Sequence, residues 1–521
     1  MANRAPDPVF QLIQSLTQSE KRHFRLFTGR QGSTEGLKFL QLFDALDAVV
    51  GAGARHDEAR LLTQILTQVP SLKRAQLANL KANLYRQLLA SLRLFHAGQN
   101  VDIQLREQLD FARVLYNKGL YQPALRMLAR VKQAAQQAEL PHVALTALDF
   151  EKLIESQHIT RSLQGRADEL AQEASALTSQ LAREHALSNA SLRLYGLYLQ
   201  AGHARNQADH ERVAAFFRTQ LPAAPGPAAG FWEQLYHAQA QVWFHTINQD
   251  FRACYRHAQR WVRLFEAQPA RQEAQPMLYL KGLHNLLLVL FNMLYYSRFK
   301  QVLRVLEDYA TYPARPTPNT EALLFQYLWT NRINLCFLEG RFTEGVEIVP
   351  ELLEQLARHR GRLDLHRTLV FYYKIACLYF GSGQYAQAIS YLNRIIEQKD
   401  LSLREDLQCF ARILNLVAHY EAGLDLELER QVRSVYHFLG RMNDQQPMQV
   451  AVFQFLRRVG STPPGQLRDE FRALKARMEE IAADPYERRP FLYFDLISWL
   501  ESKISGRSVE AVIQQKFLTL K

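Results

Sequence analysis

A helix–turn–helix unit that recurs through the middle of the chain constrains the fold more than any other feature. Its clearest copy, FYYKIACLYFGSGQYAQAISYLNRII, places Gly383, Tyr385 and Ala388 at the junction of two apolar helices. Glycine permits the positive φ of a tight helix C-cap. The aromatic residue fills the wedge between the helices, and the small residue lets their backbones approach. Since one pair cannot bury its whole apolar face, neighbouring pairs must stack.

Two further copies carry the same three residue types, at Gly119, Tyr121 and Ala124 and at Gly340, Phe342 and Gly345. Weaker copies without glycine centre on Phe251 and Phe299, and a degenerate one surrounds Gly423. The junctions at residues 249, 297, 340, 383 and 423 are 48, 43, 43 and 40 residues apart. This pattern resembles the tetratricopeptide (TPR) signature, with helices or loops longer than the standard repeat of about 34 residues allows.

The resemblance implies an all-α fold, a TPR-like α-solenoid of antiparallel helix pairs. The N-terminal segment LTQSEKRHFRLF and the helix that contains LFD also resemble the opening of an uncharacterised bacterial family of TPR-like proteins, which supplies no activity. Glycine (23) and proline (19) are too few for a β-sandwich or barrel of 521 residues. Proline-rich breaks at 221–230 and 311–321 predict loops.

Three regions are predicted along the chain. Residues 1–100 form a basic N-terminal helical bundle, 101–440 form the TPR-like repeats, and 441–521 form a C-terminal helical cap. In the first region Thr17 or Ser19 is the expected N-cap of a helix with Glu20 in its first turn. A cap is expected because the end of a solenoid needs one face in water. Whether the bundle packs on the repeats is left open by the sequence.

The charge of the chain is uneven. The formal net charge is +12, and residues 1–100 carry thirteen Lys or Arg against seven Asp or Glu. No acidic residue lies between Glu58 and Asp102. The candidate basic surface in that stretch consists of Lys73, Arg74, Arg86 and Arg93. Such a surface attracts nucleic acid, acidic proteins or anionic lipid, and an ordinary solvated helix face is an equally good interpretation.

The motifs of the common catalytic sites do not occur in the sequence. It contains no GxxxxGK[ST], GxGxxG, HExxH or GxSxG. Histidine pairs such as His203 and His210 are seven residues apart, too far for one metal site on one helix. We therefore expect no catalytic residue, no metal, no cofactor and no enzyme activity. The four cysteines are widely spaced within apolar patterns, which indicates buried thiols in a reducing cytoplasm.

In TPR-like arrays the first helix of each pair lines a concave groove. By that resemblance the candidate groove residues are Tyr236, Trp243, Phe291, Tyr295, Asn334, Phe337 and Tyr373. Aromatic side chains often anchor protein partners, although each of these residues is equally compatible with a place in the repeat core. The two-carboxylate clamp of some TPR modules is in doubt, because Tyr373 and Cys377 stand where polar clamp residues are expected.

The leading functional hypothesis is a cytoplasmic scaffold or adaptor that binds a protein or peptide in its groove. The alternative is a nucleic-acid-associated regulator that uses the basic N-terminal region. The most apolar run, Leu286 to Tyr296, is too short to span a bilayer, and Asn292 interrupts it. The sequence leaves the partner, the pathway and the oligomeric state open.

Overall fold

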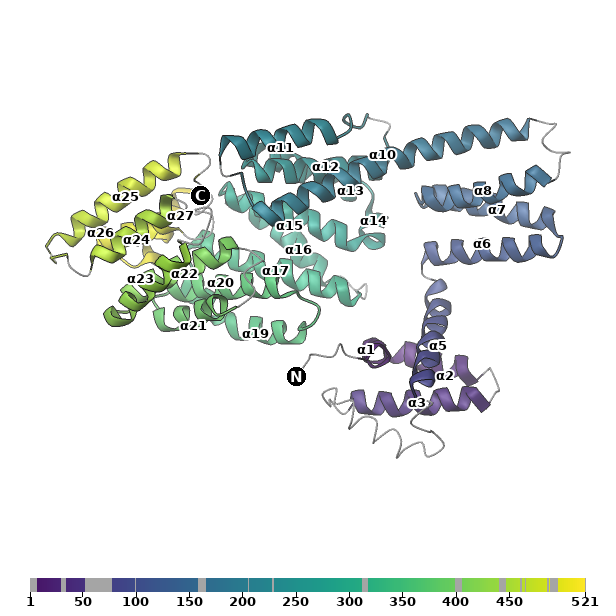
Figure 1. The fold of residues 1–521 in the computed structure, drawn as a ribbon, viewed down its shortest axis with the longest axis horizontal. Coiled ribbons are helices and arrows are strands. Elements are labelled where there is room, and N and C mark those ends of the chain that lie inside the picture. Colours follow the sequence, from purple (N-terminus) through teal and green to yellow (C-terminus); the bar gives the residue numbers. More distant parts are fainter. Residues whose placement is uncertain are drawn as a thin grey trace. The chain divides into compact units, whose positions relative to one another are not determined.

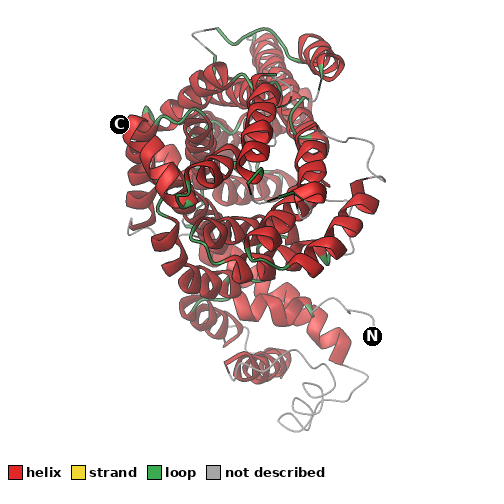
Figure 2. Cartoon of the chain, turned by 90° about the vertical axis from the view of Figure 1, so that its left-hand side faces the viewer, coloured by secondary structure: helices red, strands yellow, loops and turns green. Residues whose placement is uncertain are grey.

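The described part of the chain is entirely helical in a computed structural model, with helices joined by loops and no strand (Figure 2). The predicted all-α class is therefore confirmed. The structure describes residues 7–29, 34–51, 77–98, 100–157, 165–204, 206–226, 229–311, 317–398, 405–439, 447–459, 462–463, 465–484, 487 and 495–520.

The chain forms two compact units, Met1–Ala182 and Arg183–Lys521, and their boundary falls inside helix α10. The predicted divisions at residues 100 and 440 stay predictions. The first unit holds α1 (Pro8–Ser15), α2 (Gln18–Gly29), α3 (Thr34–Gly51), α5 (Leu77–Ala97), α6 (Val101–Asn117), α7 (Tyr121–Gln137), α8 (Pro141–Gln157) and the start of α10 (Arg166–Ala201), coloured purple to blue in Figure 1.

Local capping explains where the first helices begin. The Asp7 side chain accepts a 2.9 Å hydrogen bond from the backbone N–H of Val9 at the start of α1. At the start of α2, Thr17 and Glu20 exchange backbone-to-side-chain bonds of 2.7 and 3.3 Å. This reciprocal pair is a capping box and confirms Thr17 as the N-cap. The apolar faces of these helices form one core around Phe24, with α3 and α5.

A second core of the first unit joins α6, α7, α8 and the start of α10. A buried ion-pair network crosses it. Lys132 lies 2.8 Å from the carboxylates of both Glu151 and Glu173, and Arg166 lies 2.6 Å from Glu151. Burial raises the pKa of Glu151, but the hydrogen bonds and charges of its two cations outweigh burial and lower that pKa overall.

The second unit continues from α10 through the rest of the chain. Its helices are α11 (Gln207–Gln220), α12 (Phe231–Ile247), α13 (Phe251–Glu266), α14 (Pro269–Ala274), α15 (Pro276–Asn292), α16 (Tyr296–Thr311), α17 (Pro318–Glu339), α18 (Phe342–Glu347), α19 (Val349–Arg358), α20 (Leu365–Gly381), α21 (Tyr385–Ile396), α22 (Glu405–Glu421), α23 (Asp425–Leu439), α24 (Pro447–Val459), α25 (Leu467–Ala483), α26 (Leu496–Ser505) and α27 (Val509–Leu520).

The predicted junctions are tight turns with a left-handed residue two positions before the next helix. Gly340, Gly383 and Gly423 have φ of 64°, 79° and 67°. At the copies without glycine the same turn is made by Gln249 (φ 57°) and Leu294 (φ 56°). The second of these turns is thus centred on Leu294 and not on residue 297. Successive turns are consequently 40 to 46 residues apart, from 249 to 423.

The aromatic and small residues of the junction pack as the pattern predicts. Phe342, which begins α18, is buried against Gly381 at the end of α20, where an added Cβ would overlap its ring. A Cβ on Gly345 would lie 2.5 Å from Leu378 of α20. Neighbouring pairs therefore contact each other through these junctions, and α15, α17 and α20 follow one another in contact within the second unit.

The last helix packs back on the middle of the second unit. In α27, Glu510 accepts hydrogen bonds from the backbone N–H of Thr343 (3.0 Å) and from its hydroxyl (2.7 Å). Gln514 donates to the carbonyl of Gly340 over 3.0 Å, and Phe517 meets the ring of Tyr296 edge-on. The chain end is thus held against α16, α17 and α18, a contact that spans more than 160 residues of sequence.

Candidate functional site

Four basic side chains of α15 and α20 lie near one another within the second unit. Lys281 and His284 come from α15, and Arg367 and Lys374 come from α20. We call these four residues the cationic cluster. Their mutual electrostatic influence shows that they are near neighbours: Lys281, Arg367 and Lys374 all act on the imidazole of His284, and Arg367 acts on Lys281.

The pattern of α15 explains why two polar residues stand in an apolar helix. Pro276 starts the helix, where a missing N–H costs nothing. Leu283, Leu286 and Leu290 then repeat at helical spacing and are buried in the core. Lys281 and His284 fall on another face of the same helix, because residues three apart lie side by side and the leucines occupy the opposite stripe.

Aromatic rings surround the Lys281 ammonium group. Its Nζ atom lies 4.6 Å from the ring centre of Tyr195 on α10 and 5.4 Å from that of Trp243 on α12. Tyr195 and Trp243 also pack on each other, with ring centres 4.6 Å apart. A lysine in this position is stabilised by cation–π attraction, which cannot replace the hydration that the ammonium loses.

A chain of hydrogen bonds runs from Lys374 of α20 through two asparagines of α17 to His284 of α15. Lys374 Nζ donates to Asn334 Oδ1 over 2.6 Å, and Asn334 Nδ2 donates to Asn331 Oδ1 over 3.4 Å. Asn331 Nδ2 in turn lies 3.2 Å from Nδ1 of His284. Both asparagines of α17 are fully buried. The His284 ring stacks on Tyr327 at 4.1 Å between centres, so its orientation is fixed.

The cluster carries positive charge that nearby carboxylates do not balance. In the described residues no Asp or Glu pairs with Lys281 or Lys374, whereas Arg367 lies 3.3 Å from Asp364. Burial lowers the pKa of Lys374 to about 8, which leaves it mostly charged at pH 7. Burial, followed by the charges of the three neighbouring cations, lowers the pKa of His284 to about 3, so its imidazole is neutral.

Three of the predicted groove residues lie in this environment. Trp243 contacts Lys281, Asn334 accepts from Lys374, and the Phe337 ring centre lies 5.4 Å from the Lys374 ammonium. Tyr373 precedes Lys374 and is buried. Trp243 is also buried, and it belongs to the core between α10, α11 and α12.

The other predicted groove residues make different contacts. The Tyr295 side chain is 49% exposed, and its ring packs edge-on against Tyr255. Phe291 is partly buried against the core of α12 to α17. Tyr236 is partly buried and stacks on Trp232, with ring centres 5.7 Å apart.

None of the four cluster residues was singled out from the sequence. Their signal is a charge inside an otherwise apolar helix, as in YLKGLHNLLLVLF and FYYKIACLYF. Lysine is almost never fully buried without a partner, so a lysine within such a run marks a place with a special environment. The four residues are neighbours because α15 packs on α17 and α17 packs on α20. The sequence alone does not give that packing.

The predicted basic surface is only partly described. Arg86 and Arg93 are exposed on α5, and Arg93 lies 3.6 Å from Glu107. Lys73 and Arg74 lie outside the described residues. Other cations of the N-terminal helices are paired, as Lys21 is with Asp47 at 2.6 Å. Pairing of this kind reduces the positive potential that the composition of residues 1–100 indicates.

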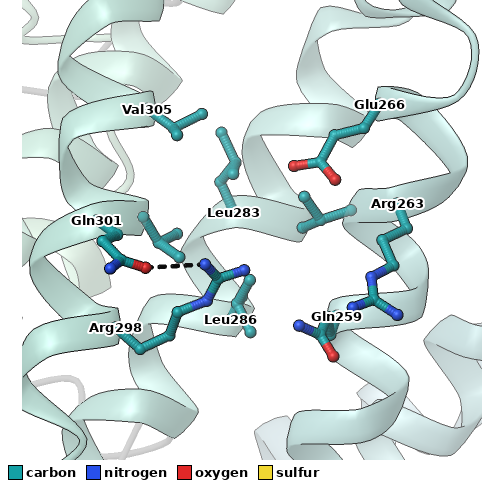
Figure 3. A pocket seen from close by; sticks show the side chains of 10 residues that line it. Gln259, Arg263, Glu266, Leu283, Leu286, Arg298, Gln301 and Val305 are labelled. Carbon is teal, nitrogen blue, oxygen red and sulfur yellow. Dashed lines mark hydrogen bonds between the residues drawn. The ribbon is translucent and has the colours of Figure 1, made fainter.

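A small pocket lies on the opposite face of α15, between α13 and α16 (Figure 3). Leu283 and Leu286 form its floor, and Arg298 donates a 2.9 Å hydrogen bond to Gln301 on one side. Its volume is about 110 Å³, room for roughly four water molecules. Because sites for organic ligands occupy about 300 Å³ or more, we do not take this pocket as the functional site.

The described residues offer neither a metal site nor a membrane span. No group of three or more His, Cys, Asp or Glu side chains there has a geometry that could hold a metal ion. None of the described helices is both long enough and apolar enough to cross a bilayer. Cys254, Cys377 and Cys409 are buried and Cys336 is partly buried, all as free thiols.

A scan of protein-family models and a search of curated proteins give no match to this chain.

Proposed function

We propose that the chain is a non-enzymatic, TPR-like scaffold or adaptor that binds a protein or peptide along the first helices of its pairs. The observation that supports this most directly is the cationic cluster with its aromatic surroundings. It lies on α15 and α20, the first helices of the pairs on either side of the pair that α17 begins, and two asparagines of α17 link them. Apolar side chains of similar volume would often stabilise a core as well as or better than buried charges do, so charges at these positions favour a role in recognition.

The repeated junctions support the TPR-like part of the proposal. Each left-handed turn is followed two residues later by a new helix, and Gly345 and Gly381 provide the close approach between pairs. An array of this kind presents many side chains over a long face, which suits recognition of an extended partner. Aromatic side chains would supply the anchors and the lysines would steer the encounter.

Affinity capture from nuclease-treated lysate at about 150 mM salt tests the proposal. We expect protein partners to remain bound to the wild type and to be lost from the Tyr236→Ala/Tyr295→Ala variant. Phe111→Ala is the matched control, because Phe111 is an exposed aromatic residue of α6 in the other unit. Enrichment of nucleic acid alone would overturn the scaffold proposal.

The nucleic-acid alternative has one observation in its favour, the exposure of Arg86 and Arg93 on α5. If that surface contacts phosphates, capture should disappear with nuclease and with Arg86→Glu/Arg93→Glu, and its dependence on salt should be steep. Capture that survives both treatments contradicts the alternative.

A further inference from the structure

We propose that the cationic cluster of Lys281, His284, Arg367 and Lys374 binds side-chain carboxylates of an acidic segment in the protein partner. The inference rests on the proposed function, and it names the chemistry of the partner and the residues that recognise it.

The first argument is the missing counter-charge. Transfer of an ammonium group from water to a protein interior is costly unless an anion or several hydrogen bonds compensate it. Lys281 and Lys374 are both more than half buried, and no carboxylate pairs with either of them in the ranges that the structure describes. A carboxylate from outside the chain would supply the compensation that the fold leaves out.

The second argument is the set of donors that remains. A lysine ammonium has three donors, and Lys374 uses one of them on Asn334. Lys281 faces the rings of Tyr195 and Trp243 and has no hydrogen-bond acceptor among the described residues. Each of the two ammonium groups thus keeps free donors, and both groups act on the imidazole of His284. An acidic segment with two carboxylate side chains would supply an acceptor to each.

The third argument concerns His284. Asn331 Nδ2 is a donor and approaches Nδ1 of the imidazole, so Nδ1 accepts and the ring proton sits on Nε2. Stacking on Tyr327 holds the ring in place. A neutral imidazole that is already oriented donates one hydrogen bond to a carboxylate and adds no repulsion to the neighbouring cations.

The shape of the cluster favours a peptide over a nucleic acid. Phosphate backbones are bound by rows of exposed Lys and Arg. Here the two lysines are largely covered, and aromatic rings flank both. A glutamate or aspartate side chain has a small charged group that suits a partly covered ammonium, and a partner's apolar residues would suit the neighbouring aromatic rings.

Fluorescence anisotropy tests the site directly. The probe is a labelled ten-residue oligoglutamate with an amidated C-terminus, compared with oligoglutamine and with oligothymidylate of the same length. We expect oligoglutamate to bind the wild type and to bind Lys281→Met/Lys374→Met at least about a hundredfold more weakly, because each lost charged hydrogen bond costs about tenfold or more.

The matched control is Arg252→Met/Arg304→Met, which removes two exposed cations from α13 and α16 and should leave the affinity within about twofold. Lys281→Arg/Lys374→Arg keeps the charge and should retain binding, which separates recognition from folding. Equal binding of oligoglutamate by the methionine pair and its control would overturn the inference. So would binding of oligothymidylate, but not oligoglutamate, through the same two lysines.

Capture from nuclease-treated lysate with the same variants separates the two proposals. Partners that bind the wild type and the methionine pair equally well would uphold the scaffold and overturn the acidic-segment site. Absence of any protein partner, together with oligoglutamate binding that needs the two lysines, would overturn the scaffold and uphold the anion site.

Discussion

Replacement of Lys374 by methionine removes a cation that the fold holds without a counter-charge. Methionine has a similar length and no charge, so it fills the same space. The variant has two opposing effects at pH 7. It ends the cost of keeping an ammonium group away from water, and it leaves Asn334 Oδ1 without its 2.6 Å donor. The two effects are each about 1–3 kcal/mol, so the difference in stability at pH 7 is small.

The pH dependence of stability isolates the charge. The pKa of Lys374 is about 8 in the folded protein, against 10.5 for an ordinary lysine. The unfolded chain therefore binds more protons than the folded one between these values, and stability rises with pH across that window. One pKa unit is worth about 1.4 kcal/mol. The wild type should thus gain about 2–3 kcal/mol relative to Lys374→Met between pH 7 and pH 10.

Urea unfolding of both proteins at pH 7, 8, 9 and 10 measures this difference. The free energies are compared as wild type minus variant at each pH, so that groups common to both proteins cancel. The chain has two compact units, and all five tryptophans belong to the second, which holds Lys374. Tryptophan fluorescence therefore follows the unfolding of that unit. Lys300→Met, at a partly exposed lysine of α16, is the matched control for the loss of a lysine side chain.

A wild-type-minus-variant difference that stays constant from pH 7 to pH 10 would refute the reasoning, since it would mean that Lys374 keeps an ordinary pKa. A gain that appears equally with Lys300→Met would refute it as well, because the effect would then belong to lysines in general.

Two other substitutions test the packing. Gly381→Ala should cost about 1–3 kcal/mol of unfolding free energy, because the new Cβ overlaps the ring of Phe342, whereas Gly196→Ala in α10 meets open space and should raise stability by about 0.5–1 kcal/mol; equal effects in thermal unfolding would contradict the junction geometry. Glu151→Gln should cost about 1–3 kcal/mol, because Lys132 and Arg166 each lose one charged partner and keep Glu173 and Glu169; since the pKa of Glu151 is lowered, the wild type should lose this advantage as the pH falls below about 4.5, and an advantage that persists in urea titrations at pH 2 would rule this out.

The helical junctions could be predicted from the sequence because they are local. Gly340, Gly383 and Gly423 adopt the positive φ for which glycine is suited. The capping box of Thr17 and Glu20 was likewise predictable, since its partners are three residues apart.

The junction at Leu294 shows the limit of local reasoning. A leucine with φ of 56° is strained on its own, and the aromatic pattern alone placed this turn three residues too late. Packing of α15 on α16 and on α13 fixes the position of the turn. Local sequence patterns do not predict contacts between helices, so they could not place this turn.

The candidate groove residues were chosen by their place on first helices, and the structure divides them. Asn334 and Trp243 contact the lysines of the cluster, whereas Tyr295 packs against Tyr255 on α13. Position within a repeat predicts which helix carries a side chain. It does not predict whether that side chain points to a lysine, to the core or to water, because neighbouring helices decide this.

The sequence by itself determined that the chain is all-α and where its glycine turns lie, because helix periodicity, caps and glycine turns depend on residues within one or two turns of each other. Only the tertiary structure decided that Lys281 and Lys374 both come near His284 and pair with no carboxylate of the described residues, and that α27 returns to Gly340 and Thr343. Those relations join residues about a hundred or more positions apart. They depend on how all the intervening helices pack on one another, and a local sequence pattern does not predict that packing.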